Sequence, residues 1–149
     1  MDLVHAKIMI LSRKMRIIHV DDHKIFNAGL RSCLKIHKQE FFIQHYQNSH
    51  HAFDAFLESI KAWEPIDLII TDMNHMGQNG YEFAKAIRAF ESSYLIRTPI
   101  LLLTMQGPNR SELVQQMLQE NLVDAYLPKS ASSEEIIETI ELLTGVRIN

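Results

Sequence analysis

Acidic, hydroxyl and ammonium side chains follow four of the short apolar runs in this sequence. Asp21 and Asp22 come after the run that ends at Val20, and Asp72 comes after Thr71. Thr104 and Lys129 follow two later runs. Each residue alone carries little information, because an aspartate after a strand is usually a turn former or a helix cap. The five side chains together form a set that can hold a metal ion and a phosphoryl group.

The chemistry of this set is phosphoryl transfer. Carboxylates held close together repel one another, which raises at least one pKa unless a cation lies among them. Mg²⁺ is bound by one or two carboxylates together with waters and phosphate oxygens. Lysine supplies a point charge to a phosphoryl oxygen, and a carboxylate can itself be the nucleophile that forms an aspartyl phosphate. The set therefore predicts Mg²⁺-assisted phosphoryl transfer, which depends mainly on positioning and electrostatics.

Apolar periodicity predicts the elements that carry these residues. Five short β-prone runs alternate with segments of helical spacing. The strands are expected over Met15–Val20, Phe41–Tyr46, Asp67–Thr71, Pro99–Leu103 and Val123–Leu127, and the helices over His23–Lys38, Ala52–Trp63 and Tyr81–Phe90, from Pro108 onward and after Ser132. Helix caps are expected at Asn109, at Ser132 and, for the last C-terminus, at Gly145. The alternation implies an α/β fold with a parallel sheet covered on both faces, whose ligand site lies at the carboxyl ends of the strands.

Composition narrows the class of protein. The chain has 149 residues, 46% of them hydrophobic, and a net charge of −3, which suits one globular domain and argues against a nucleic-acid surface. Cys33 is the only cysteine, so a disulfide or a cysteine-rich zinc site is not expected. His45, His50 and His51 lack metal-ligand spacing, and we expect them in a polar loop. Residues 1–14 are expected to be an N-terminal extension, and residues 15–149 to be the domain.

Four motifs carry a resemblance to a known family. They are Val20-Asp21-Asp22-His23, Leu68-Ile69-Ile70-Thr71-Asp72, Leu103-Thr104 and Tyr126-Leu127-Pro128-Lys129, with Gly80 eight residues after Asp72. From about Met15 to Leu143 the chain resembles response-regulator receiver domains of two-component signalling systems, and the stretches His19–Leu30 and Lys129-Ser130 resemble receivers joined to helix-turn-helix output domains. The resemblance implies a flavodoxin-like (βα)5 three-layer sandwich, with a doubly wound five-stranded parallel sheet of strand order 2-1-3-4-5.

The resemblance also implies roles for individual residues. Asp72 would accept the phosphoryl group, and Mg²⁺ would be held by Asp21, Asp22, Asp72 and the backbone carbonyl of Asn74. Thr104 and Lys129 would bind phosphoryl oxygens, and Tyr126 would be the aromatic switch.

The loop after the acceptor departs from the family pattern. Asn74, His75 and Gln106 occupy positions at which family members tune dephosphorylation. His75 and Met76 replace a common Met-Pro pair, so we expect a less rigid loop. Asn74 and Gln106 are uncharged amides that can orient water, so we expect no strong block to phosphate hydrolysis.

The expected function is that of a cytoplasmic signalling receiver without enzymatic activity beyond self-catalysed phosphotransfer and autodephosphorylation. Expected partners are a sensor histidine kinase or a histidine phosphotransfer protein. Output is expected through a downstream protein or a homodimer at the face of the fourth helix, fifth strand and fifth helix, with no direct nucleic-acid or membrane binding.

Two other functions stay open. A receiver-fold binding module that is not regulated by phosphorylation would keep the fold without the chemistry. An aspartate-nucleophile phosphatase would need a second acid two residues after its nucleophile at the first strand, where His23 or Lys24 stands instead. A flavin site is disfavoured, because three acids repel a phosphate in the absence of a metal.

Overall fold

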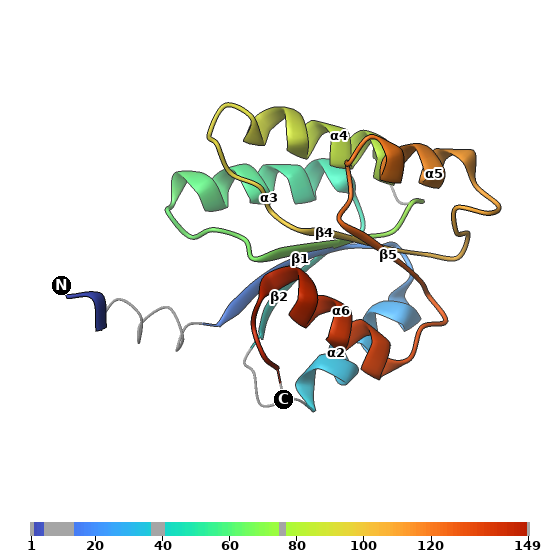
Figure 1. Cartoon of the computed structure of the whole chain (residues 1–149), viewed down its shortest axis with the longest axis horizontal. Helices are drawn as coiled ribbons and strands as arrows, with labels where there is room; N and C mark the ends of the chain where they lie inside the picture. Colours follow the sequence, from blue (N-terminus) through green and yellow to red (C-terminus); the bar gives the residue numbers. More distant parts are fainter. Residues whose placement is uncertain (1, 5–13, 37–40, 75–76, 149) are drawn as a thin grey trace.

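A computed structural model describes residues 2–4, 14–36, 41–74 and 77–148 of the chain. In this part, five parallel strands form one sheet of order β2-β1-β3-β4-β5, which confirms the predicted flavodoxin-like topology (Figure 1). The strands are β1 (Met15–Val20), β2 (Phe41–Tyr46), β3 (Leu68–Thr71), β4 (Ile100–Thr104) and β5 (Ala125–Pro128). Every residue of β3 and β4 is buried, as expected for central strands that are covered on both faces.

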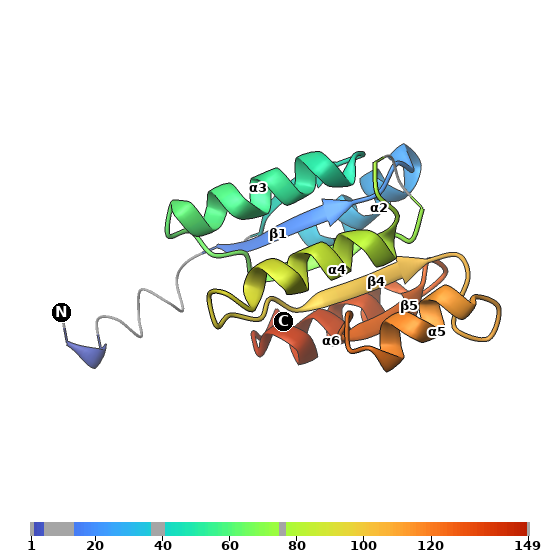
Figure 2. The ribbon, with the colours of Figure 1, turned by 90° about the horizontal axis from the view of Figure 1, so that it is seen from above.

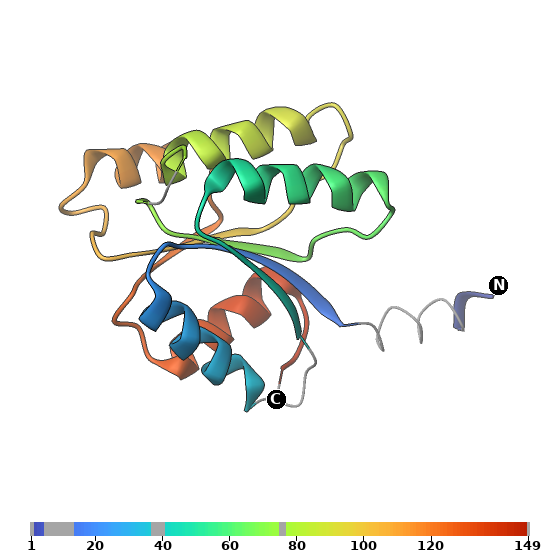
Figure 3. The same ribbon diagram turned by 180° about the vertical axis from the view of Figure 1, so that it is seen from behind.

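Helices cover both faces of the sheet and make the three-layer sandwich. They are α2 (Lys24–Lys35), α3 (Ser49–Lys61), α4 (Gly80–Glu91), α5 (Glu112–Gln119) and α6 (Ser133–Thr144). Helices α3, α4 and α5 lie on one face, and α2 and α6 lie on the other (Figures 1 and 3). Each layer encloses its own apolar core, one around Phe56 and Phe83 and one around Leu34 and Ile137. Among the described helices, none has the length and apolarity needed to cross a bilayer.

The parallel register brings the ends of the central strands to one rim of the sheet. Val20 of β1 pairs with Thr71 of β3, and Thr71 pairs with Leu102 of β4. The next residues along β1 and β3 are therefore Asp21 and Asp72, which emerge side by side. Viewed from above, the strands run in one direction between the helical layers (Figure 2).

The helix boundaries confirm two predicted caps and correct a third. Ser132 accepts a hydrogen bond from the Glu135 N–H at 3.1 Å, and Gly145 ends α6 with φ of 72°. The cap predicted at Asn109 is wrong. Helix α5 begins only at Glu112, and its cap is Ser111, whose hydroxyl accepts from the Val114 N–H at 3.2 Å. The chain makes a hydrogen-bonded turn at Gly107–Ser111 before the helix begins.

The polar loop expected for three histidines is wrong, and for His45 the predicted strand over Phe41–Tyr46 holds instead. His45 is the fifth residue of β2, and His50 and His51 are exposed in the first turn of α3. Helix α3 begins earlier than the apolar spacing indicates because Asn48 caps it, accepting from the His50 N–H at 2.8 Å. Residues 37 and 38, at the end of the helix expected over His23–Lys38, lie outside the described residues.

Candidate functional site

Three carboxylates meet where β1 and β3 end. Asp21, Asp22 and Asp72, together with the ring of His23, offer ligand atoms that all lie within 4.8 Å of one another. Asp21 is 1% exposed and Asp72 is 4% exposed, whereas Asp22 and His23 face solvent. The structure thus brings together the three acids that the sequence singles out, two of them removed from water.

Backbone contacts fix the direction of the Asp72 carboxylate. The Asp72 N–H donates to the Val20 carbonyl at 3.0 Å, and the Met73 N–H donates to Asp72 Oδ1 at 2.7 Å. Gly80 approaches from the start of α4, and its N–H donates to the Met73 carbonyl at 2.7 Å. A Cβ at position 80 would lie 2.6 Å from the Asp72 carbonyl oxygen, so this close approach requires glycine.

Lys129 links the two buried carboxylates. Its side chain is 4% exposed, and its Nζ lies 2.8 Å from Asp21 Oδ2, 2.9 Å from Asp72 Oδ2 and 2.8 Å from Nδ1 of His23. An ammonium has three donors, and these acceptors match that number. The backbone N–H of Lys129 donates to the Thr104 carbonyl at 3.1 Å, which fixes the start of this side chain beside β4.

Burial and charge shift the pKa values of this pair. Burial raises the pKa of the Asp21 carboxyl, and the hydrogen bond from Lys129 opposes that shift only in part. Burial alone would lower the pKa of the Lys129 ammonium, but the hydrogen bonds and charges of Asp21 and Asp72 outweigh burial and raise it. Lys129 therefore stays charged beside the two buried carboxylates.

The donor set fits a hard divalent cation. Opposite ligands of an octahedral Mg²⁺ lie about 4.2 Å apart, twice the usual Mg–O distance of about 2.1 Å. The observed spread of 4.8 Å needs only a small contraction to reach that geometry. Oxygen donors from two buried carboxylates and one exposed carboxylate are the chemistry that Mg²⁺ prefers, and they leave open positions for water and a phosphate oxygen. Asn74 is exposed in the loop after Met73, and the role of its carbonyl stays a prediction.

The remaining predicted site residues lie around this cluster. Thr104 ends β4 and is buried, whereas Gln106 is exposed in the loop that follows. Tyr126 is half-buried in β5 and packs against the core under α4 and α5. A Cβ at Gly107 would lie 2.5 Å from the Tyr126 hydroxyl, so the absence of a side chain there makes room for the ring. His75 lies outside the described residues.

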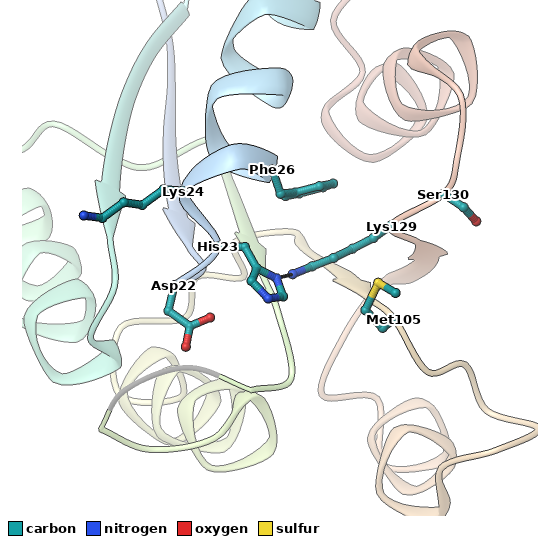
Figure 4. A pocket seen from close by; sticks show the side chains of 7 residues that line it. All are labelled: Asp22, His23, Lys24, Phe26, Met105, Lys129 and Ser130. Atoms are coloured by element: carbon teal, nitrogen blue, oxygen red, sulfur yellow. Dashed lines mark hydrogen bonds between the residues drawn. The ribbon is translucent and has the colours of Figure 1, made fainter.

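Two residues missed by sequence reasoning complete the site. His23, the residue before α2, and Phe26, in its first turn, line a hollow of about 660 Å³. Figure 4 shows their side chains with that of Asp22 and the others around the hollow. Lys129 crosses this hollow toward His23, and its Nζ lies 5.0 Å from the centre of the Phe26 ring. The sequence could have indicated both residues, because His23 directly follows Asp22 and Phe26 lies one helical turn after His23.

A histidine pair on β1 and β2, made of the buried His19 and the half-buried His45, was also missed. His19 of β1 and His45 of β2 are register partners, and their Nδ1 atoms lie 2.9 Å apart. Neither Nε2 has a hydrogen-bond partner among the described residues. Burial lowers the pKa of His19 to about 3 and that of His45 to about 4, with the positive charge of Arg31 adding to both shifts. Both rings are therefore neutral near neutral pH.

Comparison with curated proteins shows relatives in signalling. The chain is 30% identical over 126 residues to Transcriptional regulatory protein LnrK of Bacillus subtilis (strain 168), which is 85% of this chain and 52% of that protein. It is 36% identical over 78 residues to Histidine kinase CKI1 of Arabidopsis thaliana, which is 52% of this chain and 7% of that protein. The matched segments are thus about half or less of these relatives.

Solved structures and a family model point the same way. The receiver domain of CKI1 complexed with Mg²⁺ superposes with a TM-score of 0.71 at 28% identity, covering 85% of this chain and 92% of that one. The receiver domain of the putative response regulator NarL from Mycobacterium tuberculosis gives a TM-score of 0.68 at 26% identity, covering 91% and 99%. The model of the response regulator receiver domain matches residues 17–141. The chain therefore belongs to the response regulator receiver family of two-component signalling systems.

Proposed function

We propose that the chain accepts a phosphoryl group on Asp72 from a phosphohistidine of a sensor histidine kinase or a histidine phosphotransfer protein. The observation that carries the proposal is the geometry of Asp72. Its carboxylate is buried, oriented by the Met73 N–H and paired with the Lys129 ammonium, within 4.8 Å of ligand atoms from two further acids. Few roles other than phosphoryl transfer need a carboxylate, an ammonium and a cation site at one point.

In the transfer step, an Asp72 carboxylate oxygen forms a bond to phosphorus, and the bond from phosphorus to the donor imidazole nitrogen breaks. The imidazole leaves with the electron pair of that bond and takes up a proton from water. Lys129 and the Thr104 hydroxyl bind phosphoryl oxygens as the charge shifts. Mg²⁺, when bound by Asp21, Asp22 and Asp72, supplies positive charge that offsets repulsion between the acids and the phosphoryl group.

The hollow beside the acids is the proposed docking place for the donor. Its lining is mainly apolar and includes Phe26 and the exposed Met105, while Asp22, His23 and Lys24 supply polar groups at the edge. A partner that brings a phosphohistidine on a helix would bury apolar surface here and place its imidazole over Asp72.

Output is proposed to follow from phosphorylation by a population shift. The phosphoryl group can favour one conformation only through contacts that differ between two states. Thr104 and Tyr126 are positioned for such a difference, and a downstream protein or a second copy of the chain would read it at α5, β5 and α6. We propose no catalysis beyond phosphotransfer and autodephosphorylation, and Asn74 and Gln106 are expected to allow hydrolysis.

The proposal is tested by intact mass after incubation with a small-molecule phosphodonor and Mg²⁺. Wild type is expected to gain one phosphoryl group, and Asp72→Ala none. Asp54→Ala, a substitution of an exposed aspartate on α3, is the matched control and should label like wild type. Absence of labelling in folded wild type, both with the small donor and with phosphorylated kinases, would favour a binding module that is not regulated by phosphorylation.

A further inference from the structure

The end of the loop between β3 and α4 is held against the start of α3 by hydrogen bonds between Gln78 and the buried Ser49. The Gln78 N–H donates to Ser49 Oγ at 2.6 Å, and the Ser49 hydroxyl donates to the Gln78 carbonyl at 3.0 Å. Ser49 is fully buried. A reciprocal pair of hydrogen bonds from one hydroxyl to both polar groups of one residue fixes the position and the orientation of that peptide.

Beside this pair, the Gly77 backbone lies close to side chains at the start of α3. Gly77 has φ of +88°, and a Cβ there would lie 2.6 Å from Asn48 Oδ1 and 2.8 Å from Ser49 Oγ. Asn48 Oδ1 in turn accepts from the His50 N–H and caps α3. Gly77 and Gln78 therefore pack against the capped N-terminus of α3.

The loop between β3 and α4 also carries groups that act in the proposed phosphotransfer. It begins at Met73, whose N–H orients Asp72, and continues through Asn74, the predicted carbonyl ligand of Mg²⁺. A hydrogen bond from the Gly80 N–H to the Met73 carbonyl joins the two ends of this loop. Both partners of that bond belong to the loop or its ends. Ser49 belongs to a separate element, so its hydrogen bonds set Gln78 against α3.

We infer that Ser49 is a positioning residue for the metal site. It holds Gln78, two residues before Gly80, and the Gly80 N–H binds the carbonyl of Met73, the residue between Asp72 and Asn74. The inference rests on the proposed Mg²⁺ site and adds a residue outside the acid cluster. Sequence reasoning expects this loop to be less rigid because it lacks a common proline. The hydrogen bonds of Ser49 supply a restraint of a different kind on the same loop.

The test compares Ser49→Ala with a matched substitution on the same helix, Ser59→Ala. Ser59 is also buried, and its hydroxyl donates to the Phe56 carbonyl at 2.7 Å, within α3 and away from the loop. Ser49→Ala is expected to raise the Kd for Mg²⁺ in calorimetric titration by about three- to tenfold, the factor equivalent to one net hydrogen bond. Ser59→Ala should destabilise the fold in urea but leave the Kd unchanged.

Two further readouts separate positioning from stability. Ser49→Thr, which keeps the hydroxyl, should restore the Mg²⁺ affinity. Labelling of Ser49→Ala by a small phosphodonor should be slow at low Mg²⁺ and reach the wild-type rate when Mg²⁺ is raised. If Ser49→Ala loses stability as Ser59→Ala does and binds Mg²⁺ like wild type, the positioning role is overturned and the metal site stands. If wild type itself binds no Mg²⁺, the metal site and the role of Ser49 fall together.

Discussion

Replacing Lys129 by methionine should tighten the binding of Mg²⁺ while it weakens the apo fold. The Lys129 ammonium lies 2.8 Å from Asp21 Oδ2 and 2.9 Å from Asp72 Oδ2, and these two carboxylates are also proposed to hold the ion. Ammonium and cation therefore compete for the same two carboxylates. Methionine keeps the length and the apolar stem of lysine and removes only the charge.

The magnitude follows from Coulomb's law. A unit charge and a divalent ion about 5 Å apart repel by about 1.7 kcal/mol even at the dielectric constant of water, and by more in a buried site. Since 1.4 kcal/mol corresponds to about a tenfold change, Lys129→Met should lower the Kd for Mg²⁺ by about tenfold or more. Without Mg²⁺, the variant lacks the ammonium that pairs with the two buried carboxylates of Asp21 and Asp72, and it should lose about 3–5 kcal/mol of stability.

Calorimetric titration with Mg²⁺ at about pH 8, well above the usual pKa of a carboxyl group, measures the first effect. Urea unfolding with and without Mg²⁺ measures the second. Lys129→Arg keeps the charge and is the control, with an expected affinity near that of wild type. The reasoning is refuted if Lys129→Met binds Mg²⁺ no more tightly than wild type, or if Lys129→Arg gains as much affinity as Lys129→Met does.

Two other features give predictions of their own. Gly107→Ala should push the Tyr126 ring outward, because the new Cβ would lie 2.5 Å from the Tyr126 hydroxyl. Quenching of tyrosine fluorescence by acrylamide should therefore rise. Unchanged quenching would count against the contact. The pKa of His19 falls from 6.5 to about 3 in the folded state and that of His45 to about 4. Since the unfolded chain then binds more protons than the folded one, the free energy of unfolding should fall as the pH drops below 6.5. The loss from His19 alone is about 2 kcal/mol between about pH 8 and pH 5. The half-buried His45 should contribute less. Urea unfolding in a chelator at both pH values checks this, and a His19→Gln/His45→Gln variant with the same pH dependence as wild type would contradict it.

Much of the fold could be predicted from local pattern. The runs at β1 and β2 appear with the expected bounds, because apolar, β-branched and aromatic residues there are followed at once by polar residues. The start of α5 could not be predicted from local pattern, because Asn109 and Ser111 both suit a cap. Only the turn at Gly107–Ser111 selects Ser111. The start of α3 was also missed, since Asn48 and Ser49 carry no apolar signal.

The sequence by itself determined the order of the elements and the residues at the strand ends, including Asp21, Asp72 and Lys129, because hydrophobic period and chain order are local properties. Tertiary structure alone decided which distant residues touch. The pairing of His19 with His45 depends on the register of β1 and β2, and the contact of Ser49 with Gln78 depends on how α3 packs beside α4. Such contacts join segments that are distant in sequence and are brought together by packing of the whole core. No local sequence pattern therefore predicts them.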